Sequence, residues 1–188
     1  MTNSVRDRLI NSAVGLVQRH GVAGTSVAHL LEHSGVARRS IYLHFPQGKT
    51  ELITSAVTNA GNRIADLVEE LVTTHSPPAA LGAFVDFWKH LLTSSDFTAG
   101  CPIAAAAYGG TEAPAAREQA DRIFEHWQEL LVPQLVRHGA DESQAAALAT
   151  TTVAAVEGAV MLCLAARNTT PLDRVHSQLH ALLPAQRD

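Results

Sequence analysis

The chain has 188 residues and a formal net charge of −4, and 46% of its residues are hydrophobic while only 5% are aromatic. Its two cysteines are too few for a disulfide framework, so we expect a protein of the reducing cytoplasm. The first residues, MTNSVRDRL, lack the apolar stretch of a signal peptide, and no run of 18 apolar residues is free of polar interruptions. The composition therefore argues against secretion and against a membrane span.

The charge is unevenly distributed along the chain. Residues 1–51 contain six basic and three acidic side chains, whereas the rest of the chain contains eight basic and fifteen acidic ones. A small basic module on an acidic body is expected when only one end of a protein meets phosphate. A chance fluctuation of a few charges is the alternative.

Apolar periodicity, capping residues and many alanines predict helices along the whole chain and no strand. Alanine favours helix because its side chain loses no entropy there. The nine predicted helices cover about residues 4–20, 25/26–33, 37–44, 49–73, 77–93, 102–108, 114–138, 141/143–167 and 170–183. The expected fold class is therefore all-α.

We find no repeat and no flexible linker, and we therefore expect two modules that share the fourth predicted helix. The first module covers residues 1–48 and the second covers residues 49–188. Within them, Gly21 is expected to end the first helix. Thr170 is expected to open a capping box with Asp173.

Residues 25–45 have the pattern of a helix-turn-helix, in which two short helices are joined by a tight turn that contains glycine. Gly35 can adopt the positive φ of that turn without a Cβ clash. The apolar residues that can hold the pair against the first helix are Val27, Leu30, Leu31, Val36 and Ile41. The side chains that can then reach a major groove are Arg38, Arg39, Ser40, Tyr42 and Leu43.

Short motifs in this region carry a family resemblance. GTSV at residues 24–27, SGV at 34–36, IYLHF at 41–45 and GK at 48–49 resemble the TetR family of repressors. HFPQGK at 44–49, with GCP at 100–102, is similar to the LmrA/YxaF-like branch of that family. The resemblance implies a nine-helix TetR-like fold, with an N-terminal three-helix helix-turn-helix module and a C-terminal ligand-binding and dimerisation module.

The resemblance also implies roles in DNA binding. The positions that the family uses for backbone phosphates are Thr25, Tyr42, His44 and Lys49, and those on the base-reading face are Arg38, Arg39 and Ser40. Ser26 completes the predicted DNA-binding set. Arginine suits guanine edges, while hydroxyls and lysine suit phosphate.

The sequence departs from the family at Ala37, which cannot cap the third helix as serine or threonine would. The alternatives are that the two arginines are merely solvated and that Phe45 is a core aromatic.

The second module has aromatic residues at helical spacing. The predicted ligand-binding residues are Phe84, Phe87, Trp88, Leu91, Cys101, Phe124, Trp127 and Met161. Periodicity alone favours an ordinary core for such stripes, whereas the resemblance implies that some of them line an effector cavity. Cavities of this kind suit planar or lipophilic compounds, and the branch resemblance points to planar aromatic compounds such as flavonoids.

The eighth predicted helix has small side chains in close succession, at Ala145, Ala149, Thr152, Ala155, Gly158, Ala159 and Leu162. The ninth adds Leu172, Val175, Leu179 and Leu182. Small residues let helices approach closely, so these two helices can form half of a four-helix bundle across a two-fold axis, as the family resemblance implies. An internal packing face is the alternative.

The sequence thus predicts a ligand-responsive repressor that binds a palindromic operator in double-stranded DNA as a homodimer and is released by a small effector. The rival class is a cytosolic all-α enzyme, whose best constellation is Asp86, His90, His126 and Glu157. Nothing local ties these four residues into a catalytic arrangement, and we expect no catalytic residues, no cofactor and no metal site. The histidine pairs 29/33 and 176/180 have metal-compatible spacing but no third ligand nearby.

Overall fold

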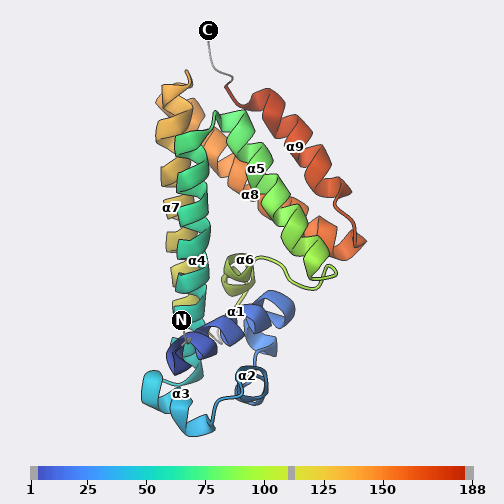
Figure 1. Ribbon diagram of the computed structural model, residues 1–188. Helices are drawn as coiled ribbons and strands as arrows, with labels where there is room; N and C mark the ends of the chain where they lie inside the picture. Colours follow the sequence, from blue (N-terminus) through green and yellow to red (C-terminus); the bar gives the residue numbers. More distant parts are fainter. Residues whose placement is uncertain (1–3, 110–112, 185–188) are drawn as a thin grey trace. The chain divides into compact units, whose positions relative to one another are not determined.

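The computed structural model describes residues 4–109 and 113–184. These residues form nine α-helices and no strand, which confirms the expected all-α fold (Figure 1). The helices are α1 (Val5–Gly24), α2 (Val27–Ser34), α3 (Arg38–His44), α4 (Lys49–Thr74), α5 (Pro77–Ser94), α6 (Pro102–Ala107), α7 (Pro114–Arg137), α8 (Glu142–Ala166) and α9 (Thr170–Leu182).

The chain folds into two compact units, which are described separately below. Unit 1 consists of residues 1–62 and 101–123, and unit 2 consists of residues 63–100 and 124–188. The division falls inside α4 and inside α7, so each of these two helices contributes residues to both units.

Unit 1 has its own hydrophobic core, built where α1, α2 and α3 meet the start of α4. The buried core residues are Leu9, Ile10, Ala13, Leu16, Leu30, Val36, Ile41, Phe45, Leu52 and Ala56, with Val27 and Leu31 packed against them. The five apolar residues predicted to hold the helix-turn-helix together therefore all do so. Phe45 is fully buried, which confirms it as a core aromatic.

Glycines with positive φ shape the C-terminal parts of the first two helices. Gly35 follows α2 with φ 62°, the left-handed conformation that the predicted turn needed. Gly21 has φ 67° and ψ −180°, which glycine adopts because it has no Cβ. The chain then resumes a helical course to Gly24, where the N–H of Thr25 donates to the carbonyl of Val22. The first helical segment therefore stops at Gly21, as predicted, and a short second segment, which the prediction did not include, extends α1 to Gly24.

In unit 2, α9 packs against both α5 and α8. The ammonium of Lys89 on α5 lies 2.5 Å from a carboxylate oxygen of Asp173 on α9 and 3.7 Å from one of Asp86. The carboxylate of Asp173 therefore forms an ion pair with Lys89 and does not take part in a capping box. The N-cap of α9 is Thr169, whose side chain makes no capping hydrogen bond, and the N–H of Thr170 donates to Asn168. The predicted capping box is wrong for this reason.

Lys89→Met should lower the free energy of unfolding by no more than about 1 kcal/mol, because Asp173 is half exposed and water screens the pair. The hydrogen bond to Asp173, reinforced by the nearby carboxylates, raises the pKa of Lys89 above its ordinary value of 10.5. The stabilisation is therefore complete below that ordinary pKa and disappears as the pH rises through the folded-state pKa. Urea denaturation at pH 7 and at a pH above the folded-state pKa should show a difference between variant and wild type only at the lower pH, and an unchanged difference would contradict the assignment.

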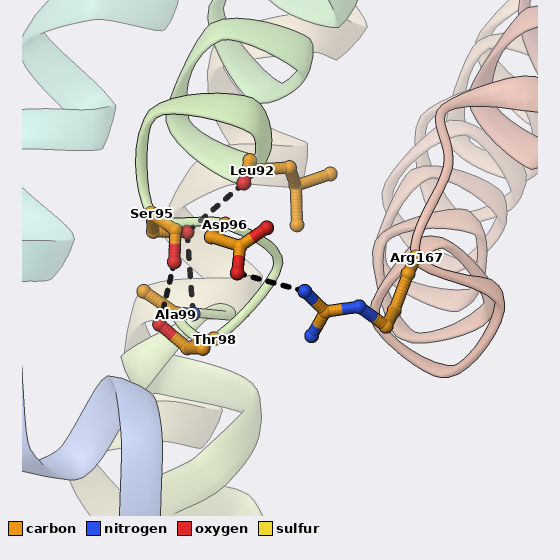
Figure 2. Close-up of polar contacts among 6 residues, drawn as sticks. All are labelled: Leu92, Ser95, Asp96, Thr98, Ala99 and Arg167. Atoms are coloured by element: carbon orange, nitrogen blue, oxygen red, sulfur yellow. Dashed lines mark hydrogen bonds and ion pairs between the residues drawn. The ribbon is translucent and has the colours of Figure 1, made fainter.

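The segment after α5 is tied to the end of α8 in the same unit (Figure 2). Asp96 and Phe97 both have positive φ, of 51° and 53°, although neither is glycine. Asp96 accepts a hydrogen bond of 2.8 Å from the guanidinium of Arg167, while the hydroxyl of Ser95 donates to the carbonyl of Leu92 and accepts from the N–H of Ala99. These contacts hold a turn that would otherwise be strained.

α8 is the one helix in the described part of the chain that is long and apolar enough to cross a membrane, by length and composition alone. Only 28% of its most apolar stretch is buried inside the chain. Small or apolar side chains are exposed along one face of α8, at Ala147, Thr151, Ala154, Met161, Leu162 and Ala165. Ala145, Ala149 and Ala159, which the sequence analysis assigned to a dimer surface, are buried within the chain instead.

Candidate nucleic-acid interface and effector cavity

α3 exposes the side chains that were predicted to read DNA. Ile41 is fully buried in the core of unit 1, whereas Tyr42 and Leu43 are 50% and 73% exposed. Arg38 and Arg39 lie exposed in the first turn, and neither forms an ion pair with a described residue. Ala37 is the N-cap of α3 and makes no side-chain capping bond, as expected. Because the opposite side of α3 is buried, the guanidinium groups of Arg38 and Arg39 face solvent without an ion-pair partner among the described residues.

The hydroxyl residues before α2 differ in how they are placed. Thr25 is fully buried, and its hydroxyl donates to the carbonyl of Gly21 at 2.8 Å. Ser26 is partly exposed and caps α2 by accepting the N–H of His29 at 3.1 Å. The hydroxyl of Thr25 is therefore engaged inside unit 1, whereas Ser26 lies at the surface where α2 begins.

Tyr42 contacts the turn that leads into α4. Gly48 in that turn has φ 68°, and a Cβ built on it would lie 3.2 Å from Cε1 of Tyr42. The ring therefore packs closely over the glycine, beside Lys49, the first residue of α4. His44 and Lys49 are both partly exposed. The structure thus brings Tyr42 near the start of α4, while the predicted base-reading residues lie in the first turns of α3.

Gly48→Ala should weaken DNA binding more than Gly35→Ala does. Both substitutions place a side chain at positive φ, which costs roughly 1–2 kcal/mol. A Cβ at Gly35 meets nothing within 4 Å, whereas one at Gly48 must displace the ring of Tyr42. Urea denaturation should therefore show similar losses of stability, while fluorescence anisotropy with labelled DNA should show a loss of affinity mainly for Gly48→Ala. Equal affinities for the two variants would mean that the position of Tyr42 does not matter.

Unit 2 contains a partly open cavity of about 70 Å³. Its lining is mostly aliphatic and aromatic and comes mainly from α4, α5, α7 and α8, with further residues just after α4 and just after α9. The lining residues are Val68, Leu71, Val72, His75, Pro77, Ala80, Leu81, Phe84, Trp127, Leu131, Gln134, Leu135, Thr152, Val153, Val156, Glu157 and Leu183. A concave apolar site with a few polar groups is the usual form of a small-molecule site.

The structure brings two of the eight predicted ligand-binding residues to this cavity, Phe84 and Trp127. Trp88 is buried one turn beyond Phe84, with ring centroids 6.4 Å apart, and it packs against Phe87. The others also lie outside the lining: Phe87, Leu91, Phe124, Cys101 and Met161. Phe124 packs edge-on against Trp127, Cys101 caps α6 in unit 1, and Met161 is 53% exposed on α8.

Sequence reasoning missed the contributions of α4 and of the polar lining residues. Gln134 interrupts the apolar run LVPQLV on α7, which was the available signal. Thr152 was assigned to the dimer surface, but it lines the cavity. Val68 and Val72 lie four residues apart on α4, so one helical face carries both of them.

A helix-turn-helix with exposed arginines, in the same chain as a helical unit with an apolar cavity, defines a DNA-binding transcriptional regulator. Comparison with known families specifies which kind. Residues 9–56 match the family model of bacterial regulatory proteins of the tetR family, and residues 77–178 match that of the transcriptional regulator LmrA/YxaF-like C-terminal domain. The chain belongs to the TetR family and to its LmrA/YxaF-like branch, which confirms both resemblances seen in the sequence.

Relatives support this membership over nearly the whole chain. The uncharacterized HTH-type transcriptional regulator Rv0196 of Mycobacterium tuberculosis (strain ATCC 25618 / H37Rv) is 35% identical, over 96% of this chain and 95% of that protein. The HTH-type transcriptional regulator LmrA of Bacillus subtilis (strain 168) is 28% identical, over 95% of this chain and 96% of its own length. These relatives are transcriptional regulators, not enzymes, and the enzyme alternative is therefore rejected.

Solved structures share the fold. A TetR transcriptional regulator from Legionella pneumophila has a TM-score of 0.86 and 23% identity, covering 97% of this chain and 100% of that one. The TetR family regulator CifR, solved as a cysteine mutant with 26 bp double-strand operator DNA, has a TM-score of 0.77 and 20% identity, covering 96% of each chain.

Proposed function

We propose that this TetR-family regulator is a repressor that binds a palindromic operator as a homodimer and is released by a planar or lipophilic effector. The observation that carries the DNA-binding part is α3, whose two exposed arginines are not paired within the described chain and whose opposite side is locked by Ile41. The structure of CifR with operator DNA supports the same use of the fold. A repressor must reach DNA, so a cytoplasmic location follows.

Within this proposal, Arg38, Arg39 and Ser40 read bases, and Ser26, Tyr42, His44 and Lys49 contact phosphates. Thr25 holds the start of α2, because its hydroxyl is already bonded to Gly21. Residues 1–48 then form the DNA-binding domain, and residues 49–188 form the ligand-binding and dimerisation domain. Lys49 begins the helix whose later residues line the cavity.

The dimer part of the proposal rests on the exposed face of α8. Leu162 and Met161 are 59% and 53% exposed, and Leu182 on α9 is 57% exposed. Leu162 also lines a shallow groove, together with Ala165, Ala166, Pro171, Arg174 and Val175. Exposed apolar side chains gathered on two adjacent helices are typical of a subunit interface, so we assign this surface to a four-helix bundle with a second copy. The same bundle accounts for the apolar character of α8.

The effector part rests on the cavity of unit 2. Its volume of about 70 Å³ is roughly half that of the 150 Å³ engineered cavity known to admit benzene. A planar aromatic effector must therefore separate the helices that line the cavity, including α4. Because α4 continues back to Lys49, a shift of this helix changes the DNA-binding end of the chain.

Selection of bound fragments from genomic DNA by the purified protein, followed by footprinting, tests the proposal. The expected footprint is a near-palindrome with half-sites one DNA turn apart, roughly 34–36 Å. Protection of a single half-site, or no enrichment of any sequence, would contradict the dimeric repressor.

A further inference from the structure

Leu43 on α3 is an apolar side chain that the chain leaves in contact with water. It is 73% exposed, more than Leu162, Met161 and Leu182, the apolar residues of the surface assigned above to the dimer. Single exposed apolar residues are common on protein surfaces, so exposure alone gives Leu43 no role. Its position on the helix-turn-helix provides the further evidence.

The helical register of α3 places Leu43 beside Arg39. Ile41 is fully buried and marks the side of α3 that faces the core of unit 1. Successive residues of an α-helix are about 100° apart, so Arg39 and Leu43 each lie about 160° from Ile41, on the opposite side. Residues four apart also share one face of a helix. Arg39 and Leu43 therefore form the outermost ridge of α3, and both are exposed.

The neighbouring side chains of α3 lie nearer to the body of unit 1. Ser40 and Tyr42 flank the ridge, each about 100° from Ile41. Ser40 is only partly exposed, and the ring of Tyr42 packs closely over Gly48 in the turn that leads to α4. When α3 enters a major groove, the ridge of Arg39 and Leu43 therefore reaches the base edges first.

The two residues of the ridge suit different bases. The guanidinium of Arg39 can donate to O6 and N7 of guanine, whereas the side chain of Leu43 can neither donate nor accept a hydrogen bond. The apolar group that DNA presents in the major groove is the 5-methyl group of thymine, which cytosine lacks. Four residues of α-helix rise about 6 Å, which is less than two base-pair steps of about 3.4 Å.

We propose that Leu43 is a specificity-determining residue that reads the 5-methyl group of a thymine within about two base pairs of the base read by Arg39. The inference rests on the proposed function, in which α3 enters the major groove of the operator, and adds one base and the chemistry that selects it. Because the protein binds as a homodimer in that proposal, the thymine recurs in both half-sites.

The test removes the methyl group from the DNA. Each thymine of the operator selected from genomic DNA is replaced in turn by deoxyuridine, in both half-sites together, which leaves the hydrogen-bonding groups of the base pair unchanged. Burial of one methyl group contributes about fourfold to affinity, so one thymine position should weaken wild-type binding by roughly 15-fold when both contacts are lost. Fluorescence anisotropy of the labelled duplexes measures this loss.

The matching change in the protein is Leu43→Ala. This variant should bind the unmodified operator roughly 15-fold more weakly and should bind the operator with deoxyuridine at that position equally well. The control is Val5→Ala on α1 in the same unit, where the valine is 37% exposed and lies outside α3; it should keep the full dependence on the methyl group. Because Leu43 is exposed, the Tm of Leu43→Ala should match that of the wild type.

The outcomes separate this inference from the proposed function. Equal binding of the thymine and deoxyuridine operators at every position would overturn the role of Leu43 and leave the repressor standing. Dependence on the methyl group that persists in Leu43→Ala, with or without a lower Tm, would overturn it as well. Arg39→Ala locates the base that Arg39 reads, and a methyl-dependent thymine more than about two base pairs from it would contradict the register. The absence of any sequence-specific footprint would contradict both proposals.

Discussion

Removal of both exposed arginines of α3 should abolish sequence-specific DNA binding. A single arginine that reads a guanine contributes about 1–3 kcal/mol of specific binding. The double variant Arg38→Ala/Arg39→Ala should therefore lose at least roughly 30-fold in operator affinity, because about 2 kcal/mol corresponds to that factor. Fluorescence anisotropy with labelled operator and with a scrambled sequence measures the loss, and the two affinities should become similar.

The matched control is Arg63→Ala/Arg117→Ala, which removes the same charge from exposed positions on α4 and α7. This control should keep the ratio of operator to scrambled affinity, even where the lower charge weakens both. The arginines of α3 are exposed, so circular dichroism should show an intact fold in both double variants. Operator binding by a folded Arg38→Ala/Arg39→Ala protein at wild-type strength would rule out α3 as the recognition helix.

A charge on the exposed face of α8 should separate the dimer. Leu162→Glu would bury an unpaired carboxylate at the proposed interface, which is strongly unfavourable. Leu162 is 59% exposed in the single chain, so the variant should fold normally. Analytical ultracentrifugation should show monomers, and operator affinity should drop to the non-specific level because one half-site contact remains.

Val136→Glu is the control for this experiment, since Val136 is an apolar residue on α7 that is 38% exposed. It should stay dimeric and bind operator. A dimeric Leu162→Glu protein would place the interface on another surface. Ala159 is unsuitable for this test, because it is 1% exposed and a charge there would disrupt the chain's own packing.

The helices and the helix-turn-helix could be predicted because the signals for them are local. Apolar residues at helical spacing identified the buried face of α2 and α3, and Gly35 marked the turn between them. The short helical segment after Gly21 could not be predicted in this way, because the chain can either leave a helix or continue it beyond a kink at a glycine with positive φ. Whether the helix continues depends on whether the residues after the glycine pack against the rest of the chain. Val22 does so, because its side chain is buried.

The effector cavity was predicted less well, for a physical reason. Periodicity shows which face of a helix is buried, but it does not show where along that face the packing leaves a gap. Phe84 and Trp88 share a face of α5, yet only Phe84 lines the cavity. The same limit explains α8, where small residues occur on both the buried and the exposed face and only contacts with α5 and α9 distinguish them.

We propose that the protein releases DNA when it binds its effector, and reciprocal binding tests this most directly. A planar aromatic compound that raises the Tm of the free protein is chosen first, and its affinity is then measured calorimetrically with and without saturating operator. Operator should weaken the compound's binding by roughly 5–150-fold, and the compound should weaken operator binding by the same factor. Equal affinity of the compound for the free and the operator-bound protein would contradict the account.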